Sequence, residues 1–178
     1  MKVVGIDQSL NGTGYAYRDG ADVMTDRISV KTLKGIPRLA YVKRRITEVL
    51  DYAQPSLVVL EDYAMGIGKG GRTYHIGELG GVLKILCWER GIDVMIVNIK
   101  TVKELIAGHG GADKPEMVAA AANRFGIAVD AHDEADACGL MLVGEARVFG
   151  QGPADFKKQV QACKKGITFT RGFLQLKT

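Results

Sequence analysis

Short apolar runs, separated by turn-forming residues, recur along the chain and predict β-strands. The run at 2–6 is rich in β-branched residues, which is typical of a buried strand, and the stretch at 12–20 alternates before a turn at Asp19 and Gly20. We expect five strands, at residues 2–6, 12–20, 21–30, 56–61 and 92–98. Because only short turns separate the first three strands, we expect these to form an antiparallel meander.

Helical periodicity fills the intervals between and after these strands. Pro37 favours the start of a helix that continues to about Ala53, since the apolar residues between them share one face. Further helices are expected at about 73–90, 99–107, 113–125 and 131–146. This order of elements predicts an α/β fold in which helices pack on a mixed sheet.

The composition is that of a soluble globular protein, and it excludes several classes. The chain has 178 residues, of which 47% are hydrophobic and 25% charged, values that favour one folded core over disorder. No apolar stretch approaches the roughly 20 residues that a membrane-spanning helix needs, and the amino-terminal segment does not resemble a secretory signal. Three widely separated cysteines argue against a disulfide framework and a structural zinc site, so we expect a cytoplasmic protein with no membrane partner.

Positive charge gathers in two places. Residues 150–178 contain six lysines and arginines against one acidic residue, and residues 31–45 contain six such cations and no acid. Clusters of this kind suit a polyanion, although a solvated helix face gives the same pattern. We divide the chain into a domain at 1–146 and a basic C-terminal extension at 147–178, which we expect to be either a poorly packed appendage or a short extra element.

Four carboxylates occupy positions that favour a metal site. Asp7 and Glu61 each end an apolar strand, and adjacent strand ends would bring them together. Asp133 and Asp136 are three residues apart, on one face of a predicted helix. Clustered carboxylates repel one another unless a cation is present, and oxygen ligands suit Mg²⁺ or Mn²⁺ rather than zinc. Two such ions would catalyse in-line displacement at phosphorus.

Each of these acids also has an ordinary explanation when it is taken singly. An aspartate after a strand is usually a turn residue, and an acid pair on a helix is usually exposed or caps the helix. His132, beside the acid pair, is either a ligand or water-orienting base or, more simply, a solvent-facing residue. The conjunction of two strand ends with one helix face favours the metal site.

Four segments of the chain resemble the RuvC family of Holliday junction resolvases, which belongs to the RNase H-like superfamily. GIDQSLNGTGYAY resembles the first strand and turn of that family, with Asp7 at its catalytic aspartate, and VVLEDYAMG resembles the strand with the catalytic glutamate, here Glu61. TVKELIAGHGGADKPEMV resembles the segment with two functional lysines, here Lys103 and Lys114. DEADACGL resembles the closing helix with Asp133 and Asp136, and the order and spacing agree from residue 1 to about residue 145.

The resemblance implies an RNase H-like fold with a five-stranded mixed sheet, in which three antiparallel N-terminal strands precede two parallel ones. It implies a homodimer that resolves four-way DNA junctions by paired nicks, with two Mg²⁺ ions in each active site, Mn²⁺ as a substitute and no nucleotide cofactor. Asp7, Glu61, Asp133 and Asp136 would be the catalytic metal ligands. Lys114 would act near the scissile phosphate, where it stabilises transition-state charge, and Lys103 would contact the DNA backbone.

The loop after Glu61 differs from the pattern of the family, whose aromatic residue wedges into the junction centre. Tyr63 lies one residue away from the expected place, and Lys69 and Arg72 would meet DNA phosphates. The helix at 73–90 would carry the dimer interface by resemblance, although its apolar residues would equally serve packing on their own sheet. These are Leu79, Leu83, Ile85, Leu86 and Trp88.

Other functions stay open at this point. The first strand and turn also look like those of actin-like and sugar kinase ATPases, but the chain is too short to supply their second domain. A general nuclease for forks and flaps, a nuclease for RNA–DNA hybrids and a non-catalytic junction-binding module share the same fold. The small size and basic tail are compatible with a bacteriophage version, and the sequence does not distinguish recombination, fork repair and viral DNA debranching.

Overall fold

The computed structural model describes residues 1–9, 11–62, 72–129 and 132–170, and its central feature is a mixed β-sheet of six strands. The strands follow one another across the sheet in the order β3-β2-β1-β4-β5-β6. They are β1 (Val3–Asp7), β2 (Gly12–Asp19), β3 (Asp22–Ser29), β4 (Leu57–Asp62), β5 (Asp93–Asn98) and β6 (Ile167–Thr170). The α/β class is therefore confirmed.

The directions of the strands agree with the predicted mixed sheet, but the number of strands does not. β1, β2 and β3 form an antiparallel meander, and β1, β4 and β5 run parallel to one another. The sixth strand, β6, pairs antiparallel with β5 at the edge of the sheet. It has four residues, and its formation depends on that distant partner rather than on a local pattern, which is why we expected five strands.

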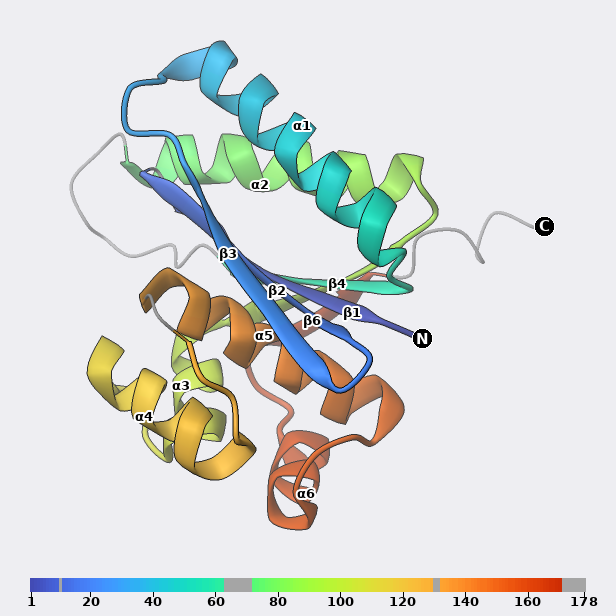
Figure 1. Cartoon of the computed structure of the whole chain (residues 1–178), viewed down its shortest axis with the longest axis vertical. Coiled ribbons are helices and arrows are strands. Elements are labelled where there is room, and N and C mark those ends of the chain that lie inside the picture. Colours follow the sequence, from blue (N-terminus) through green and yellow to red (C-terminus); the bar gives the residue numbers. More distant parts are fainter. Residues whose placement is uncertain (10, 63–71, 130–131, 171–178) are drawn as a thin grey trace.

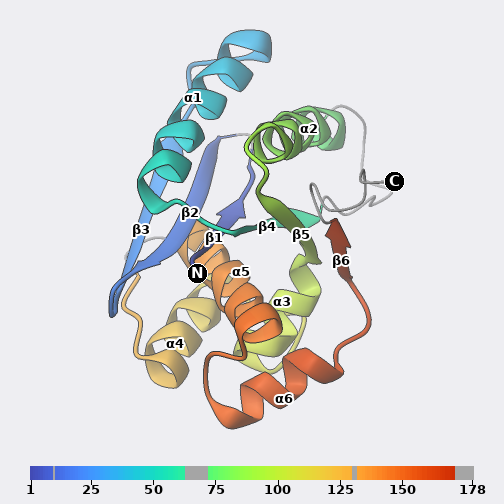
Figure 2. The same ribbon diagram turned by 90° about the vertical axis from the view of Figure 1, so that its right-hand side faces the viewer.

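Helices cover both faces of the sheet (Figures 1 and 2). One face carries α1 (Gly35–Ala53) and α2 (Arg72–Glu89), whose apolar side chains pack with those of β1 and β4. The other face carries α3 (Ile99–Ala107), α4 (Lys114–Phe125), α5 (His132–Phe149) and α6 (Ala154–Ala162). Within the described parts of the chain, no helix combines the length and the apolar character that crossing a membrane requires.

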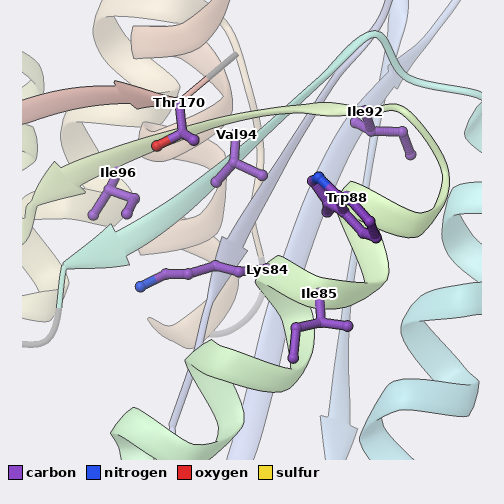
Figure 3. A pocket seen from close by; sticks show the side chains of 7 residues that line it. All are labelled: Lys84, Ile85, Trp88, Ile92, Val94, Ile96 and Thr170. Atoms are coloured by element: carbon purple, nitrogen blue, oxygen red, sulfur yellow. The ribbon is translucent and has the colours of Figure 1, made fainter. Parts of the chain in front are cut away.

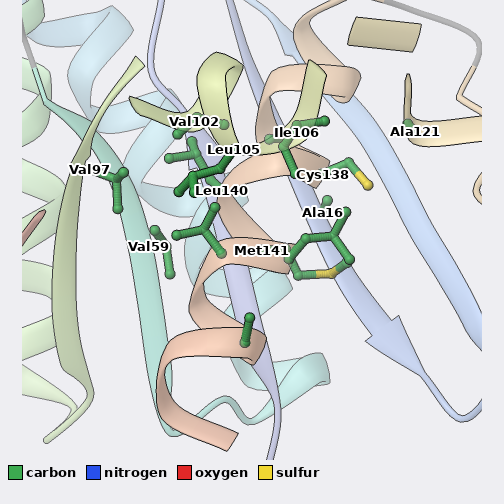
Figure 4. Packing of buried hydrophobic residues seen from close by; sticks show 14 of the residues in the cluster. Ala16, Val59, Val97, Val102, Leu105, Ile106, Ala121, Cys138, Leu140 and Met141 are labelled. Carbon is green, nitrogen blue, oxygen red and sulfur yellow. The ribbon is translucent and has the colours of Figure 1, made fainter. Parts of the chain in front are cut away.

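The central helix α5 lies unusually close to β1, and two glycines make this possible. A Cβ atom at Gly5 would overlap the carbonyl oxygen of Ala137 and lie 2.5 Å from the backbone nitrogen of Met141. A Cβ atom at Gly144 would lie 2.6 Å from a methyl group of Val59. Figure 4 shows the apolar packing under this helix. Close contact between helix and sheet fixes the start of α5 relative to the end of β1.

The C-terminal segment packs on the rest of the molecule. Phe156 and Val160 of α6 are fully buried in the core beneath α5. The rings of Phe156 and Phe125 pack edge to face, with 4.9 Å between their centroids. Arg147 donates hydrogen bonds from Nη1 to the carbonyl oxygens of Val160 and Gln161. Of our two expectations for this segment, the short extra element is the one observed. The division of the chain at residue 146 stays a prediction.

Candidate active site

Two carboxylates meet at the carboxyl ends of the parallel strands β1 and β4. Ile6 of β1 is paired with Leu60 of β4, so the next residues, Asp7 and Glu61, emerge side by side. Asp7 is buried, with 6% of its surface exposed, and its side chain shares a hydrogen bond with that of Glu61. A hydrogen bond between two carboxyl groups requires a proton on one of them.

A third carboxylate, Asp136, approaches from α5. The close packing of Ala137 on Gly5 brings this turn of the helix to β1. The charge of Asp136 acts on Glu61, and Oδ1 of Asp136 is shielded from solvent. Lys103 of α3 supplies a positive charge to the same group.

The surroundings of Glu61 disfavour its charged form. Burial is the main cause of a raised pKa for this carboxyl group, and the negative charges of Asp136 and Asp62 raise the pKa further. The hydrogen bond with Asp7 and the positive charge of Lys103 act in the opposite direction without offsetting the burial. A buried group of oxygen donors in which ionisation is opposed fits a divalent cation, which would stabilise the charged forms.

The side chains are not yet arranged as ligands around one point. Among the residues described, no three His, Cys, Asp or Glu side chains are grouped closely enough to hold a metal ion. Charge interactions act over longer distances than metal–oxygen bonds, so Asp7, Glu61 and Asp136 interact without forming a cage. The side chains of His132 and Asp133 lie outside the described residues, so the predicted set of four acids stays a prediction.

The other predicted site residues are distributed around this end of the sheet. Lys103 is half-buried on α3 and interacts with Glu61, whereas Lys114 is exposed at the first position of α4, directly after the cap residue Asp113. Tyr63 and Lys69 lie outside the described residues, as does the side chain of Arg72, the first residue of α2. Their predicted contacts with DNA stay predictions.

Gln8 belongs to the site but was not among the residues predicted from the sequence. It is buried directly after Asp7, and its Nε2 donates a hydrogen bond of 3.0 Å to the backbone oxygen of Glu61. The bond ties the end of β1 to the end of β4 and so holds the two carboxylates together. The sequence feature that could have identified Gln8 is its position as a polar residue between an apolar strand and a turn.

Comparisons with known proteins point in one direction. The family model described as crossover junction endodeoxyribonuclease RuvC matches residues 3–143. The protein of that name from Chloroflexus aggregans is 28% identical over 151 residues, which cover 80% of this chain and 91% of the relative. The one from Thermomicrobium roseum is 27% identical over 124 residues, which cover 66% of this chain and 74% of the relative.

Solved structures share the fold. The RuvC structure from Thermus thermophilus superposes with a TM-score of 0.68 at 24% identity, covering 86% of this chain and 99% of that one. The same protein in complex with a Holliday junction substrate gives a TM-score of 0.68, with 80% and 91% covered. The yeast mitochondrial Holliday junction resolvase Ydc2 gives a TM-score of 0.54 at 15% identity, with 89% and 80% covered.

Proposed function

Because the chain belongs to the RuvC family of crossover junction endodeoxyribonucleases, we propose that it resolves four-way DNA junctions by paired nicks. The observation that carries this proposal is the contact between Asp7 and Glu61 at adjacent strand ends, with Asp136 near them. Relatives of this chain are bacterial proteins, and we propose that it acts on DNA in the cytoplasm.

Nucleases of this family depend on a metal ion, and we propose Mg²⁺, two ions in each active site, with Mn²⁺ as a substitute. Asp7, Glu61 and Asp136, together with Asp133, would hold the ions. Bound Mg²⁺ supplies Lewis acidity and lowers the pKa of water.

Residues of the chain position the carboxylates for that chemistry and favour their charged forms. The pairing of β1 with β4 holds Asp7 and Glu61 side by side, and Gln8 keeps the strand ends from separating. The positive charge of Lys103 lowers the pKa of Glu61 and so favours its charged form, which is the form that binds a cation.

The cations around this end of the sheet would hold the DNA. We propose that Lys114 stabilises the charge that develops on the scissile phosphate and that Lys103 also contacts the backbone. Lys69 and Arg72 would bind further phosphates, and Tyr63 is our candidate for the side chain that inserts into the junction.

Helix α2 offers a surface for a homodimer. Its residues Leu79, Leu83 and Leu86 are buried in the core of their own chain, whereas Ile85 and Trp88 are 57% and 54% exposed. These two exposed side chains line an apolar pocket beside β5, together with Ile92, Val94 and Ile96 (Figure 3).

Two glycines extend the exposed stripe of α2. Gly77 and Gly81 precede Ile85 and Trp88 at helical spacing. Apart from the adjoining residues and the nearby backbone of α2 itself, no described atom lies within 4 Å of a Cβ position at either glycine. Small residues of this kind permit the close approach of a second helix. We therefore propose that two copies of the chain pair through this stripe, and the sequence alone did not separate its residues from those of the core.

The test of the proposed function is cleavage of a synthetic mobile four-way junction in Mg²⁺, beside a linear duplex, a fork and an RNA–DNA hybrid. We expect symmetric paired nicks in the junction and intact controls. Equal cutting of the fork would indicate a general branched-DNA nuclease instead. Tight junction binding without cutting of any substrate would indicate a binding module and overturn the catalytic role of the acids.

A further inference from the structure

A second pocket lies at the same end of the sheet as the acids. It has a volume of about 280 Å³ and lies between the turn after β1, the segment from β3 to α1, and the start of α2. Its polar lining consists of Asn11, Lys31, Lys34, Arg38 and His75. Three of these are cations, and the lining residues include no carboxylate.

The topology explains why the pocket neighbours the acids. β3 runs antiparallel to β2 and β2 antiparallel to β1, so β3 ends where β1 ends and α1 begins there. Asn11 follows Asp7 by four residues, which limits the distance between their Cα atoms to about 15 Å. Figure 1 shows α1 beginning at this end of the molecule.

Arg38 is the unusual residue of the pocket. It is 6% exposed, and its Nε and Nη2 atoms have no hydrogen-bond partner among the described residues. A buried guanidinium group without an acceptor is costly, because desolvation removes the water that would otherwise satisfy it. Arg38 also lines an open pocket, so an anion in that pocket is the acceptor that would offset this cost.

The start of α1 adds to the attraction for an anion. Its first turn contains no acidic residue, and the cap residue Lys34 makes no side-chain capping hydrogen bond. The backbone N–H groups of a helix start and the helix dipole favour negative charge. Lys31 and Lys34 are exposed. His75 of α2 also lines the pocket, and its Nδ1 lies 2.8 Å from Oε2 of Glu78.

We propose that this pocket, which we call the Arg38 pocket, binds a backbone phosphate of the DNA substrate, a few nucleotides from the phosphate that is cut. The proposal rests on the proposed junction cleavage, and the limit of about 15 Å between the Cα atoms of Asn11 and Asp7 allows one DNA strand to reach both places. A phosphate oxygen accepts hydrogen bonds from a guanidinium fork. The pocket would therefore fix the register of the strand in the active site without reading its sequence.

The test replaces single junction phosphates, one at a time, with neutral methylphosphonates and measures binding to wild type and Arg38→Met. We expect one position near the cut site at which the replacement weakens wild-type binding about tenfold. Arg38→Met should bind the unmodified junction about tenfold more weakly and be indifferent to the replacement at that position. The slope of log affinity against log salt should fall by about one. Equal losses in both proteins, or no sensitive position, would overturn the proposal.

A stability measurement separates this role from a structural one. Because Arg38→Met removes a buried charge that no described residue pairs with, we expect the unfolding midpoint of the variant to rise by about 3 °C. A fall in the midpoint would mean that Arg38 supports the fold and would overturn the proposal. Lys34→Gln, at an exposed position, should weaken junction binding while the midpoint stays unchanged.

Arg44→Gln is the matched control, since Arg44 is exposed further along the same helix. An equal loss of binding in Arg44→Gln would indicate diffuse attraction and contradict a defined pocket. A saturable rise of the wild-type midpoint with inorganic phosphate, combined with no sensitive junction position, would assign the pocket to a free anion instead. If wild type neither binds nor cuts the junction, the proposed function itself fails, an outcome distinct from wild type cutting normally while Arg38→Met binds equally well.

Discussion

Two regions of this molecule hold charged side chains that are buried or partly buried, and the charges are compensated differently in the two regions. On the face covered by α5, Arg18 of β2 forms a fork with Glu145, with its Nε 3.0 Å from Oε1 and its Nη2 3.1 Å from Oε2. At the carboxyl ends of β1 and β4, the surroundings of Glu61 disfavour its charged form. In the first turns of α1, Nε and Nη2 of Arg38 have no hydrogen-bond partner among the described residues.

The difference separates folding from function. Arg18 and Glu145 compensate the charge of each other within the chain, and the carboxylate raises the pKa of Arg18. This pair therefore needs no ligand. The acids and Arg38 carry charges of opposite sign at one end of the sheet. Each of these charges would be compensated by a ligand that does not belong to the chain. A divalent cation and a DNA phosphate are the ligands that would supply it.

The largest expected effect is that of Asp7→Asn. Loss of a carboxylate ligand should reduce junction cleavage by about a thousandfold or more, while junction binding persists because the basic surface is unchanged. Cleavage rates and gel-shift binding, measured on the same preparations, provide the comparison. Asp22→Asn, at an exposed position of β3, should cut at the wild-type rate. Normal cutting by Asp7→Asn would show that the acids are not the catalytic centre.

Gly5→Ala should disturb both regions at once. The added methyl group would overlap the Ala137 carbonyl and push α5 away from β1, which should cost about 3 kcal/mol in the free energy of unfolding. The shift also moves Asp136, so cleavage by the folded protein should fall. Urea denaturation and cleavage assays measure the two effects.

Gly111→Ala is the control for this substitution. A Cβ atom there would lie 3.8 Å from Nδ1 of His109, an ordinary contact, so stability should change little. If Gly5→Ala were as stable and active as Gly111→Ala, the close packing of α5 would not position the site.

Glu145→Gln should affect stability and leave chemistry untouched. The substitution leaves Arg18 without its counter-charge, and we expect a loss of about 2 kcal/mol, because Arg18 keeps some access to water. The double variant Arg18→Met with Glu145→Met should recover most of that loss. A large loss of cleavage per folded molecule in Glu145→Gln would remove the distinction between the two regions.

The smallest expected effect is a pH dependence of stability in the absence of divalent ions. The pKa of Glu61 is raised in the folded protein above its ordinary value of 4.5. As the pH rises from about 4.5 through that raised pKa, the unfolded chain loses its proton first, so stability falls by about 1.4 kcal/mol per pH unit within the window. Glu61→Gln should lack this component, and matching pH profiles of the two proteins would contradict the assigned cause.

Much of the fold could be predicted from periodicity, because most elements are defined by local patterns. The helix at 99–107 is present with those bounds, and the helix expected from Pro37 begins two residues earlier, at Gly35. β6 was not predicted as a strand of the sheet, since an edge strand of four residues depends on a partner far away in the sequence. The sequence also did not show which side of α2 faces the core, because apolar residues of this helix occur on all of its sides.

The candidate site was partly predictable for a related reason. Strand ends that are adjacent in a sheet bring Asp7 and Glu61 together, and the structure places them in contact. The approach of α5 depends on Gly5, whose role appears only once the helix lies across the sheet. Arg38 stood out in the sequence merely as one cation among six in residues 31–45, because burial and the lack of a partner are properties of the fold.

The most direct test of the account is thermal unfolding in the absence of DNA, with Mg²⁺ titrated into wild type and Asp7→Asn at pH 8. If the buried acids form a cation site, the wild-type midpoint should rise and saturate by mass action, and Asp7→Asn should show little or no rise. An equal rise in both proteins, or no rise in wild type, would contradict the claim that these acids bind a metal ion.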